Sequence, residues 1–173
     1  MDMFNHSGAV FSPCRQYRYR LWRIWDERLP VATFIMLNPS TADDTENDPT
    51  VERCQRRAMQ LGFGGLRVAN LFAWRSTDPE ALYSATKDPV GRLNDQAIYD
   101  QSKDAGIVIC AWGTHGNYMD RGEQVLKMLR ETGIQPHHLQ LNRDGTPKHP
   151  LYVSYEQKPT PYSMPDIAEQ IHD

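Results

Sequence analysis

The chain has 173 residues, a formal net charge of −3 and 39% apolar residues, which is typical of one globular domain large enough to bury a core. No apolar run approaches the roughly 18 residues of a membrane span, and Met1–Ser7 lacks the basic start and apolar stretch of a secretion signal. We therefore expect a cytoplasmic protein with no membrane partner. The net negative charge argues weakly against strong non-specific DNA binding, which needs clustered Lys and Arg.

The first half of the chain predicts two strands and a helix. Residues 17–25 alternate large and basic side chains, the pattern of a strand with one buried face. Residues 31–37 form a near-continuous apolar run, as expected of a central parallel strand, and Asn-Pro-Ser at 38–40 ends it. The Asp-Pro pair at 48 and 49 suits the cap and first turn of a helix over 48–62, which would end at a glycine.

The second half alternates strands and helices in the same way. The remaining predicted elements are a strand at 66–71, a loop at 76–92 with one helical turn at most, a helix at 93–105, a strand at 107–112, a helix at 120–132, a strand at 138–142, and a Pro-rich tail that is weakly helical after 158. This order predicts an α/β fold, a three-layer α/β/α sandwich around a central, mostly parallel four-stranded sheet. We expect a single domain over 1–173, with the tail at 156–173.

The three cysteines are odd in number and far apart. Cys14, Cys54 and Cys110 match neither a disulfide framework nor the spacing of a zinc or iron–sulfur site. We expect three unpaired thiols in a reducing compartment.

Apolar runs that end abruptly in polar residues indicate where a ligand would bind. Asn38 follows one run, Gly113 follows another, and His149 comes late in the chain before a proline. Ligands bind at the carboxyl ends of the strands in an open α/β sheet, so these ends can meet at one pocket. An Asn and a His, without a metal set or a phosphate loop, suit recognition of a base and assistance to a small bond cleavage. Asn70, inside an apolar run, either caps a backbone group or faces a ligand, because an unpaired amide is costly to bury.

Several charged segments leave alternatives open. The acidic loop at 43–48 has three interpretations: a divalent-cation site, a general base at Asp43 or Asp44, or helix capping within a solvated loop. The arginine clusters at 15–23 and 53–57 either follow a phosphate backbone or form a solvated face. Trp74 and Arg75 either stack on a base and grip a phosphate, or are a core Trp beside a surface Arg.

The order of four short motifs resembles the uracil-DNA glycosylase superfamily. The motifs are Leu37-Asn38-Pro39-Ser40, Val68-Ala69-Asn70-Leu71, Ile109-Cys110-Ala111-Trp112-Gly113 and Lys148-His149-Pro150-Leu151. Over residues 14–155 the chain also looks like a bacterial family of unknown function, DUF1643. That resemblance rests on Tyr17-Arg18-Tyr19, on 37–43, on 70–77 and on 149–152.

The glycosylase resemblance implies base flipping, in which a nucleotide is extruded into a pocket and its Watson–Crick edge is read. Asn70 would read the base, His149 would stabilise the leaving base, and Asn38 would position the attacking water. No metal or cofactor is implied. No aromatic residue lies between 37 and 62, so Phe72 or Trp74 would stack on the base.

The remaining expected contacts are Pro39 and Ser40 to the base, and Arg75, Lys148 and Thr114 to phosphate. The expected partner is a nucleic acid or a nucleotide, bound by a monomer through a single base. Two alternatives stay open: a non-catalytic binder of a nucleotide or modified base, and a metal-dependent nucleotide hydrolase that uses the 43–48 loop.

Overall fold

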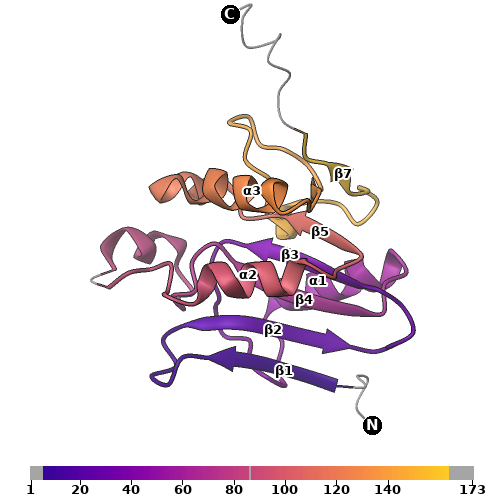
Figure 1. Cartoon of the computed structure of the whole chain (residues 1–173), viewed down its shortest axis with the longest axis horizontal. Coiled ribbons are helices and arrows are strands. Elements are labelled where there is room, and N and C mark those ends of the chain that lie inside the picture. Colours follow the sequence, from indigo (N-terminus) through magenta and orange to yellow (C-terminus); the bar gives the residue numbers. More distant parts are fainter. Residues whose placement is uncertain (1–5, 86, 164–173) are drawn as a thin grey trace, which may run out of the picture.

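A computed structural model describes residues 6–85 and 87–163, in which helices cover both faces of one sheet (Figure 1). The strands are β1 (His6–Phe11), β2 (Arg18–Ile24), β3 (Val31–Met36), β4 (Gly65–Asn70), β5 (Ile107–Cys110), β6 (Pro136–His138) and β7 (Thr160–Pro161). The helices are α1 (Pro49–Gln60), α2 (Asn94–Ser102) and α3 (Arg121–Glu131), with short 3₁₀ helices η1 (Pro79–Ser84), η2 (Thr114–Asp120) and η3 (Pro150–Tyr152).

Within the described residues the sheet holds seven strands in the order β1-β2-β4-β3-β5-β6-β7. The pairs β4–β3, β3–β5 and β5–β6 are parallel, and the pairs β1–β2, β2–β4 and β6–β7 are antiparallel. The expectation of a four-stranded, mostly parallel sheet is therefore wrong, although the mixed α/β class is confirmed. The short connection between β1 and β2 explains part of the difference, because a tight turn can join only antiparallel neighbours.

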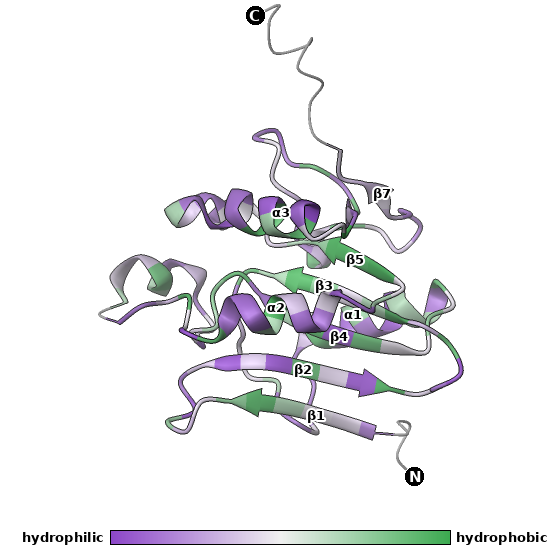
Figure 2. Ribbon diagram, in the orientation of Figure 1, coloured by the Kyte–Doolittle hydropathy of each residue, from purple (hydrophilic) through white to green (hydrophobic). Residues whose placement is uncertain are grey.

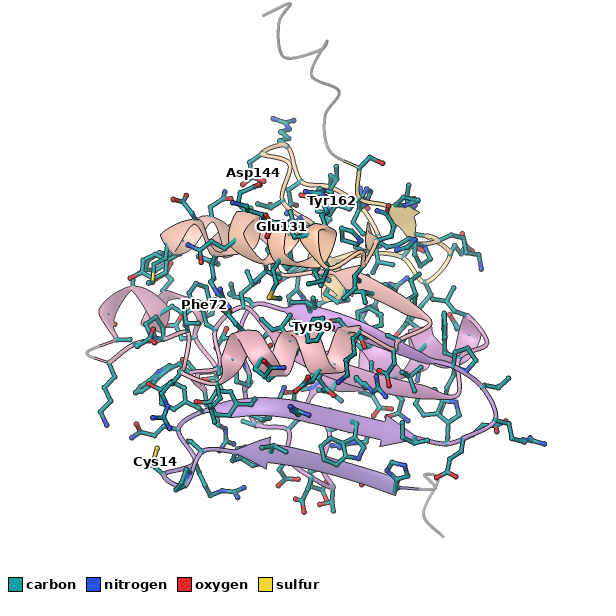
Figure 3. The ribbon with its side chains drawn as sticks, viewed as in Figure 1. Cys14, Phe72, Tyr99, Glu131, Asp144 and Tyr162 are labelled. Carbon is teal, nitrogen blue, oxygen red and sulfur yellow. The ribbon has the colours of Figure 1, made fainter. Side chains whose placement is uncertain are left out.

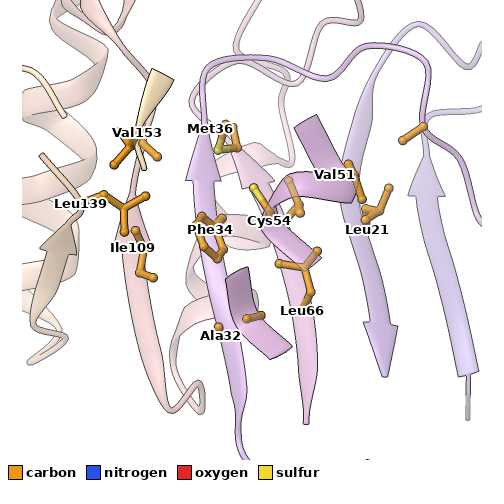
Figure 4. Close-up of a cluster of buried hydrophobic side chains, with 14 residues drawn as sticks. Leu21, Ala32, Phe34, Met36, Val51, Cys54, Leu66, Ile109, Leu139 and Val153 are labelled. Atoms are coloured by element: carbon orange, nitrogen blue, oxygen red, sulfur yellow. The ribbon is translucent and has the colours of Figure 1, made fainter. Parts of the chain in front are cut away.

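Two apolar cores lie on opposite faces of the sheet. In the central strand β3, Phe34 and Met36 pack on the face covered by α1 (Figure 4), whereas Ile35 packs on the face covered by α2 and α3. The apolar colouring of β3 and β5 follows from burial on both faces (Figure 2). Full burial of a side chain such as Phe34 or Ile35 contributes about 1.5–3 kcal/mol to stability.

The start of α1 confirms the capping chemistry expected from the sequence. Asp48 is the N-cap, its side chain accepts a hydrogen bond from the Val51 amide at 2.9 Å, and Pro49 occupies the first helical position. The chain leaves the helix at Gly62, whose φ of +86° is readily adopted by glycine. This cap fixes Asp48 close to the carboxyl end of the sheet, where the candidate site lies.

The strand expected at 138–142 is wrong in its bounds, because β6 ends at His138. Beyond it Leu141 makes an isolated bridge to Pro147 rather than a continuous strand. The weak helix expected in the tail lies, after residue 163, outside the described residues. No helix in the described part of the chain is long and apolar enough to cross a membrane.

All three cysteines are unpaired. Cys14 is exposed in the connection between β1 and β2 (Figure 3), while Cys54 and Cys110 are buried in the two cores. Burial raises the pKa of the Cys54 thiol to about 12, so this thiol stays protonated at neutral pH.

Candidate functional site

A cavity of about 530 Å³ lies at the carboxyl ends of β3, β4 and β5. Its lining includes Met36 to Ser40 after β3, Val68 and Asn70 from β4, Trp112 to His115 after β5, the start of α1 at Asp48, Thr50 and Val51, the loop residues Ser76, Thr77 and Pro79, and the late residues Asn142, Lys148, His149, Leu151 and Tyr152. Of the residues expected from the sequence, the structure brings these to the cavity: Asn38, Pro39, Ser40, Asn70, Thr114, Lys148 and His149. Segments far apart in the chain thus meet at one edge of the sheet, as parallel topology requires.

Asn70 ends β4 and is the least satisfied polar side chain of the site. It is 2% exposed, and neither Oδ1 nor Nδ2 has a hydrogen-bond partner in the described part of the chain. The interpretation of Asn70 as a side-chain cap therefore has no hydrogen bond to support it. A buried polar group left unpaired costs about 1–3 kcal/mol, so this amide is a natural place for a ligand to bind.

Asn38 follows β3, and its amide has a fixed orientation. Nδ2 donates to the carbonyl of Ser76 at 2.9 Å and to that of Pro39 at 3.3 Å. These two bonds use the donor side of the amide and leave Oδ1 as a hydrogen-bond acceptor. The side chain is thus suited to accept a hydrogen bond from a water or a ligand in the cavity.

His149 precedes η3 and is half-buried in the cavity wall. Its Nδ1 accepts a hydrogen bond from the Leu151 amide at 3.3 Å, which places the proton of the neutral ring on Nε2. Burial lowers the pKa of His149 below its ordinary 6.5, and the nearby negative charge of Asp48 opposes this in part. At neutral pH the ring is therefore an uncharged donor through Nε2–H.

Two charged side chains in the wall, Arg18 and Asp48, were not expected there. Arg18 begins β2, is 2% exposed and donates from Nη1 to the Ala42 carbonyl at 3.0 Å, while its Nε has no partner. Burial lowers the pKa of Arg18 to about 10, against the influence of Asp48, so the guanidinium remains charged at pH 7. Asp48 is the one carboxylate among the described lining residues, and it accepts from the Val51 and Ala42 amides.

The sequence contained a weak signal for each of these two. Arg18 lies in the alternating segment 17–25, which predicts a strand. The alternation does not single out this arginine among the others of the 15–23 cluster. Asp48 was predicted as a helix cap, which it is. A cap at the start of a helix that follows a buried strand also lies at the carboxyl edge of the sheet, and this second consequence was missed.

The acidic residues Asp43 and Asp44 lie away from the cavity lining. Asp43 Oδ1 accepts from the backbone amides of Glu46 and Thr45, which lowers its pKa, and Asp44 is exposed. The buried Arg23 holds this loop by donating to the Asp43 carbonyl at 2.6 Å. Within the described residues there is no group of three His, Cys, Asp or Glu side chains placed to hold a metal ion.

Phe72, Trp74 and Arg75 are likewise absent from the cavity lining. Phe72 is fully buried in the core beneath α2 and α3 (Figure 3). Trp74 packs edge-on against Tyr17, with ring centroids 5.5 Å apart. Arg75 lies over the Phe11 ring, 4.8 Å from its centroid. The aromatic rings that do line the cavity are those of Trp112, His115, His149 and Tyr152.

Two arginines of the 53–57 cluster fasten the segment that follows His149. Arg53 donates to the carbonyls of Pro150 and Val153 at 2.8 and 2.7 Å. Arg57 donates to the carbonyl of Val153 at 2.9 Å and to that of Ser154 at 3.1 Å. These contacts give the two side chains a structural role: they hold η3, and with it His149, against α1.

A family model described as "Protein of unknown function (DUF1643)" matches residues 18–151. No curated protein and no solved structure matches the chain. The matched range contains every described lining residue except Tyr152.

Proposed function

The chain belongs to the DUF1643 family, and we propose that it binds a nucleobase in this cavity and hydrolyses the N-glycosidic bond of that base, in DNA or in a nucleotide. The observation that carries the proposal is Asn70 at the cavity wall, whose buried amide has a donor and an acceptor that no group in the described part of the chain engages. Such a pair is complementary to the hydrogen-bonding edge of a base.

The chemistry assigned to the site needs three side chains. Asn70 orients the base through Oδ1 and Nδ2. Asn38 Oδ1 accepts a hydrogen bond from a water and directs the water oxygen at C1′ of the sugar. The C1′–N bond breaks with its electron pair passing to the base, the water oxygen bonds to C1′, and the water loses a proton to solvent. His149 donates Nε2–H to an oxygen of the departing base, which stabilises its negative charge.

A fold relationship is part of the proposal. The four parallel strands β4, β3, β5 and β6 and the order of the four motifs along the chain support a likeness to the uracil-DNA glycosylase superfamily. In that arrangement the motifs of Asn38, Asn70 and His149 reach the same end of the sheet. The extra strands β1, β2 and β7 would be additions at its two edges.

Base release tests this function directly. We would incubate the purified protein in excess with single- and double-stranded oligonucleotides that carry uracil, hypoxanthine, or oxidised or hypermodified pyrimidines, and with free nucleotides in parallel. Release that disappears in His149→Ala, while the variant keeps the thermal unfolding of a folded protein, would support glycosidic cleavage and identify the base. Equal release by wild type and His149→Ala would contradict it.

A second candidate, a non-catalytic binder of a nucleotide or modified base, is favoured by one observation. Asp48 is the one carboxylate among the described lining residues, and its two oxygens accept backbone hydrogen bonds at the start of α1, so capping accounts for this residue without a catalytic role. Saturable binding of a base or nucleotide that is lost in Asn70→Ala, with no release from any substrate, would select this function.

A further inference from the structure

Arg18 has a buried charge that the described part of the chain leaves only partly satisfied. One hydrogen bond from Nη1 reaches a neutral carbonyl, that of Ala42, and Nε has no partner. No carboxylate of the described residues forms an ion pair with Arg18. A charge taken out of water ordinarily needs an opposite charge and further hydrogen bonds.

The surroundings of Arg18 limit what can supply that partner. Asp48 influences the charge electrostatically, but among the described contacts it forms no ion pair with Arg18, and its oxygens accept hydrogen bonds from the backbone amides of Val51 and Ala42. The cavity walls beside it include the apolar side chains of Met36, Val51 and Val68, which suit a flat ring better than a hydrated ion. A ring-containing ligand that carries an anionic group would meet both conditions.

We propose that Arg18 determines specificity by binding an anionic oxygen group of the ligand while Asn70 binds the ring, an inference that rests on the proposed binding of a base. Arg18 begins β2 and Asn70 ends the neighbouring antiparallel strand β4, so both lie at the same end of this strand pair. A guanidinium matches two oxygens of a carboxylate or a phosphate in one plane. The anionic group has two possible sources, a carboxylate on the ring or the phosphate of a nucleotide.

Four small ligands separate these sources. Isothermal titration at low ionic strength would compare uracil with orotate, which adds a ring carboxylate, and uridine with uridine monophosphate, which adds a phosphate. We expect one anionic ligand to bind wild type at least about 10-fold tighter than its neutral counterpart, the range of one charge-assisted hydrogen bond. The member of the pair that shows this gain identifies the source.

Arg18→Met removes the charge and keeps an apolar stem, and Arg20→Met is its matched control. Arg20 lies two residues along the same strand and pairs with Asp100 at 2.6 Å, away from the cavity lining. The gain for the anionic ligand should disappear in Arg18→Met and persist in Arg20→Met. As a measurement that needs no folded variant, the Nε–H resonance of Arg18 in wild type should shift with the anionic ligand and not with the neutral one.

The outcomes separate this inference from the function on which it rests. Equal affinities for neutral and anionic ligands in wild type, or a preference that survives in Arg18→Met, overturn the role of Arg18 and leave base binding in place. Binding by none of the four ligands overturns the role of Arg18, and the base-release assay on oligonucleotides then decides the proposed function separately.

Discussion

The side-chain amide of Asn38 donates to the main-chain carbonyl of Ser76 at 2.9 Å, which ties the end of β3 to the loop that follows β4. This bond connects residues 38 positions apart and sets the direction of the remaining amide oxygen. Asn38 therefore has a structural role through Nδ2, which holds the loop, and a proposed functional role through Oδ1, which accepts a hydrogen bond. Substitution can separate the two roles.

Asn38→Ala should lower base release about 100-fold or more, because the water loses the group that directs it. The lost bond to Ser76 should reduce the free energy of unfolding by only about 1 kcal/mol, or roughly 2–4 °C in melting temperature for a chain of this size. Base-release assays and thermal unfolding would measure the two effects. Full activity in a variant that melts normally would remove Asn38 from the site.

Asn70→Leu should abolish ligand binding and raise the free energy of unfolding by about 1–3 kcal/mol, because it replaces an unpaired buried amide with an apolar side chain. Asn94→Leu is the matched control. Asn94 is also fully buried, but its Nδ2 donates to the carbonyls of Asn70 and Leu71. This second variant should be destabilised, since two carbonyls lose their donor. Chemical denaturation would give both values, and destabilisation of Asn70→Leu would show that its amide has a structural partner.

The lowered pKa of His149 predicts a pH dependence below neutrality. The unfolded chain binds a proton near pH 6.5 and the folded chain only at lower pH, so the stability contributed by this ring is complete above about 6.5. It falls as the pH drops through the folded-state pKa. The difference in unfolding free energy between wild type and His149→Gln, measured by chemical denaturation at each pH, should shrink over that window.

Base release should follow the same window as the stability. A proton on Nδ1 removes the acceptor for the Leu151 amide, and the start of η3, which His149 caps, would move with it. We expect full activity at pH 7 and a decline that begins below 6.5. A pH–rate profile that rises on acidification would show that the charged ring is the active form.

Local signals predicted the parts of the fold that local chemistry determines. The run 31–37 marked β3, which spans Val31–Met36, because a strand buried on both faces must be apolar throughout. The cap at Asp48 marked the start of α1. The edge strands β1 and β7 were missed, because pairing with β2 and β6 stabilises them and Gly8 is the one buried residue in these two strands.

The residues of the candidate site also include some that the sequence predicts and some that it does not. Asn38, Asn70 and His149 follow apolar runs or precede a proline, so topology alone places them at one edge of the sheet. Arg18 and Arg20 are indistinguishable in the sequence, yet one is buried at the cavity and the other pairs with Asp100. Which arginine is buried depends on the packing of β2 against β4 and on the path of the chain near Ala42, and neither is a local property.

The last prediction concerns how His149 is held in place. Arg57 is 1% exposed and donates to the carbonyls of Val153, Ser154 and Gln157, so it fastens the segment after η3 to α1. Arg57→Met should reduce the free energy of unfolding by about 2–4 kcal/mol, since one buried and two partly buried hydrogen bonds lose their charged donor. Its neighbour Arg56 is exposed, with its guanidinium carbon 5.8 Å from the centroid of the Tyr155 ring, and gives the control Arg56→Met, which should be close to wild type.

A role of Arg57 in positioning His149 predicts a local effect on hydrogen exchange in addition to the loss of stability. Hydrogen exchange at residues 150–157 should accelerate in Arg57→Met under conditions where the amides of β3 and β4 stay protected, because the hydrogen bonds of Arg57 go to that segment. The catalytic rate should fall more than the affinity for the base, since Asn70 is untouched while His149 loses its fixed direction. Uniform acceleration of exchange across the sheet would instead mean that Arg57 supports the whole fold. The position of His149 would then be set by η3 and by the hydrogen bond that its Nδ1 accepts from the Leu151 amide.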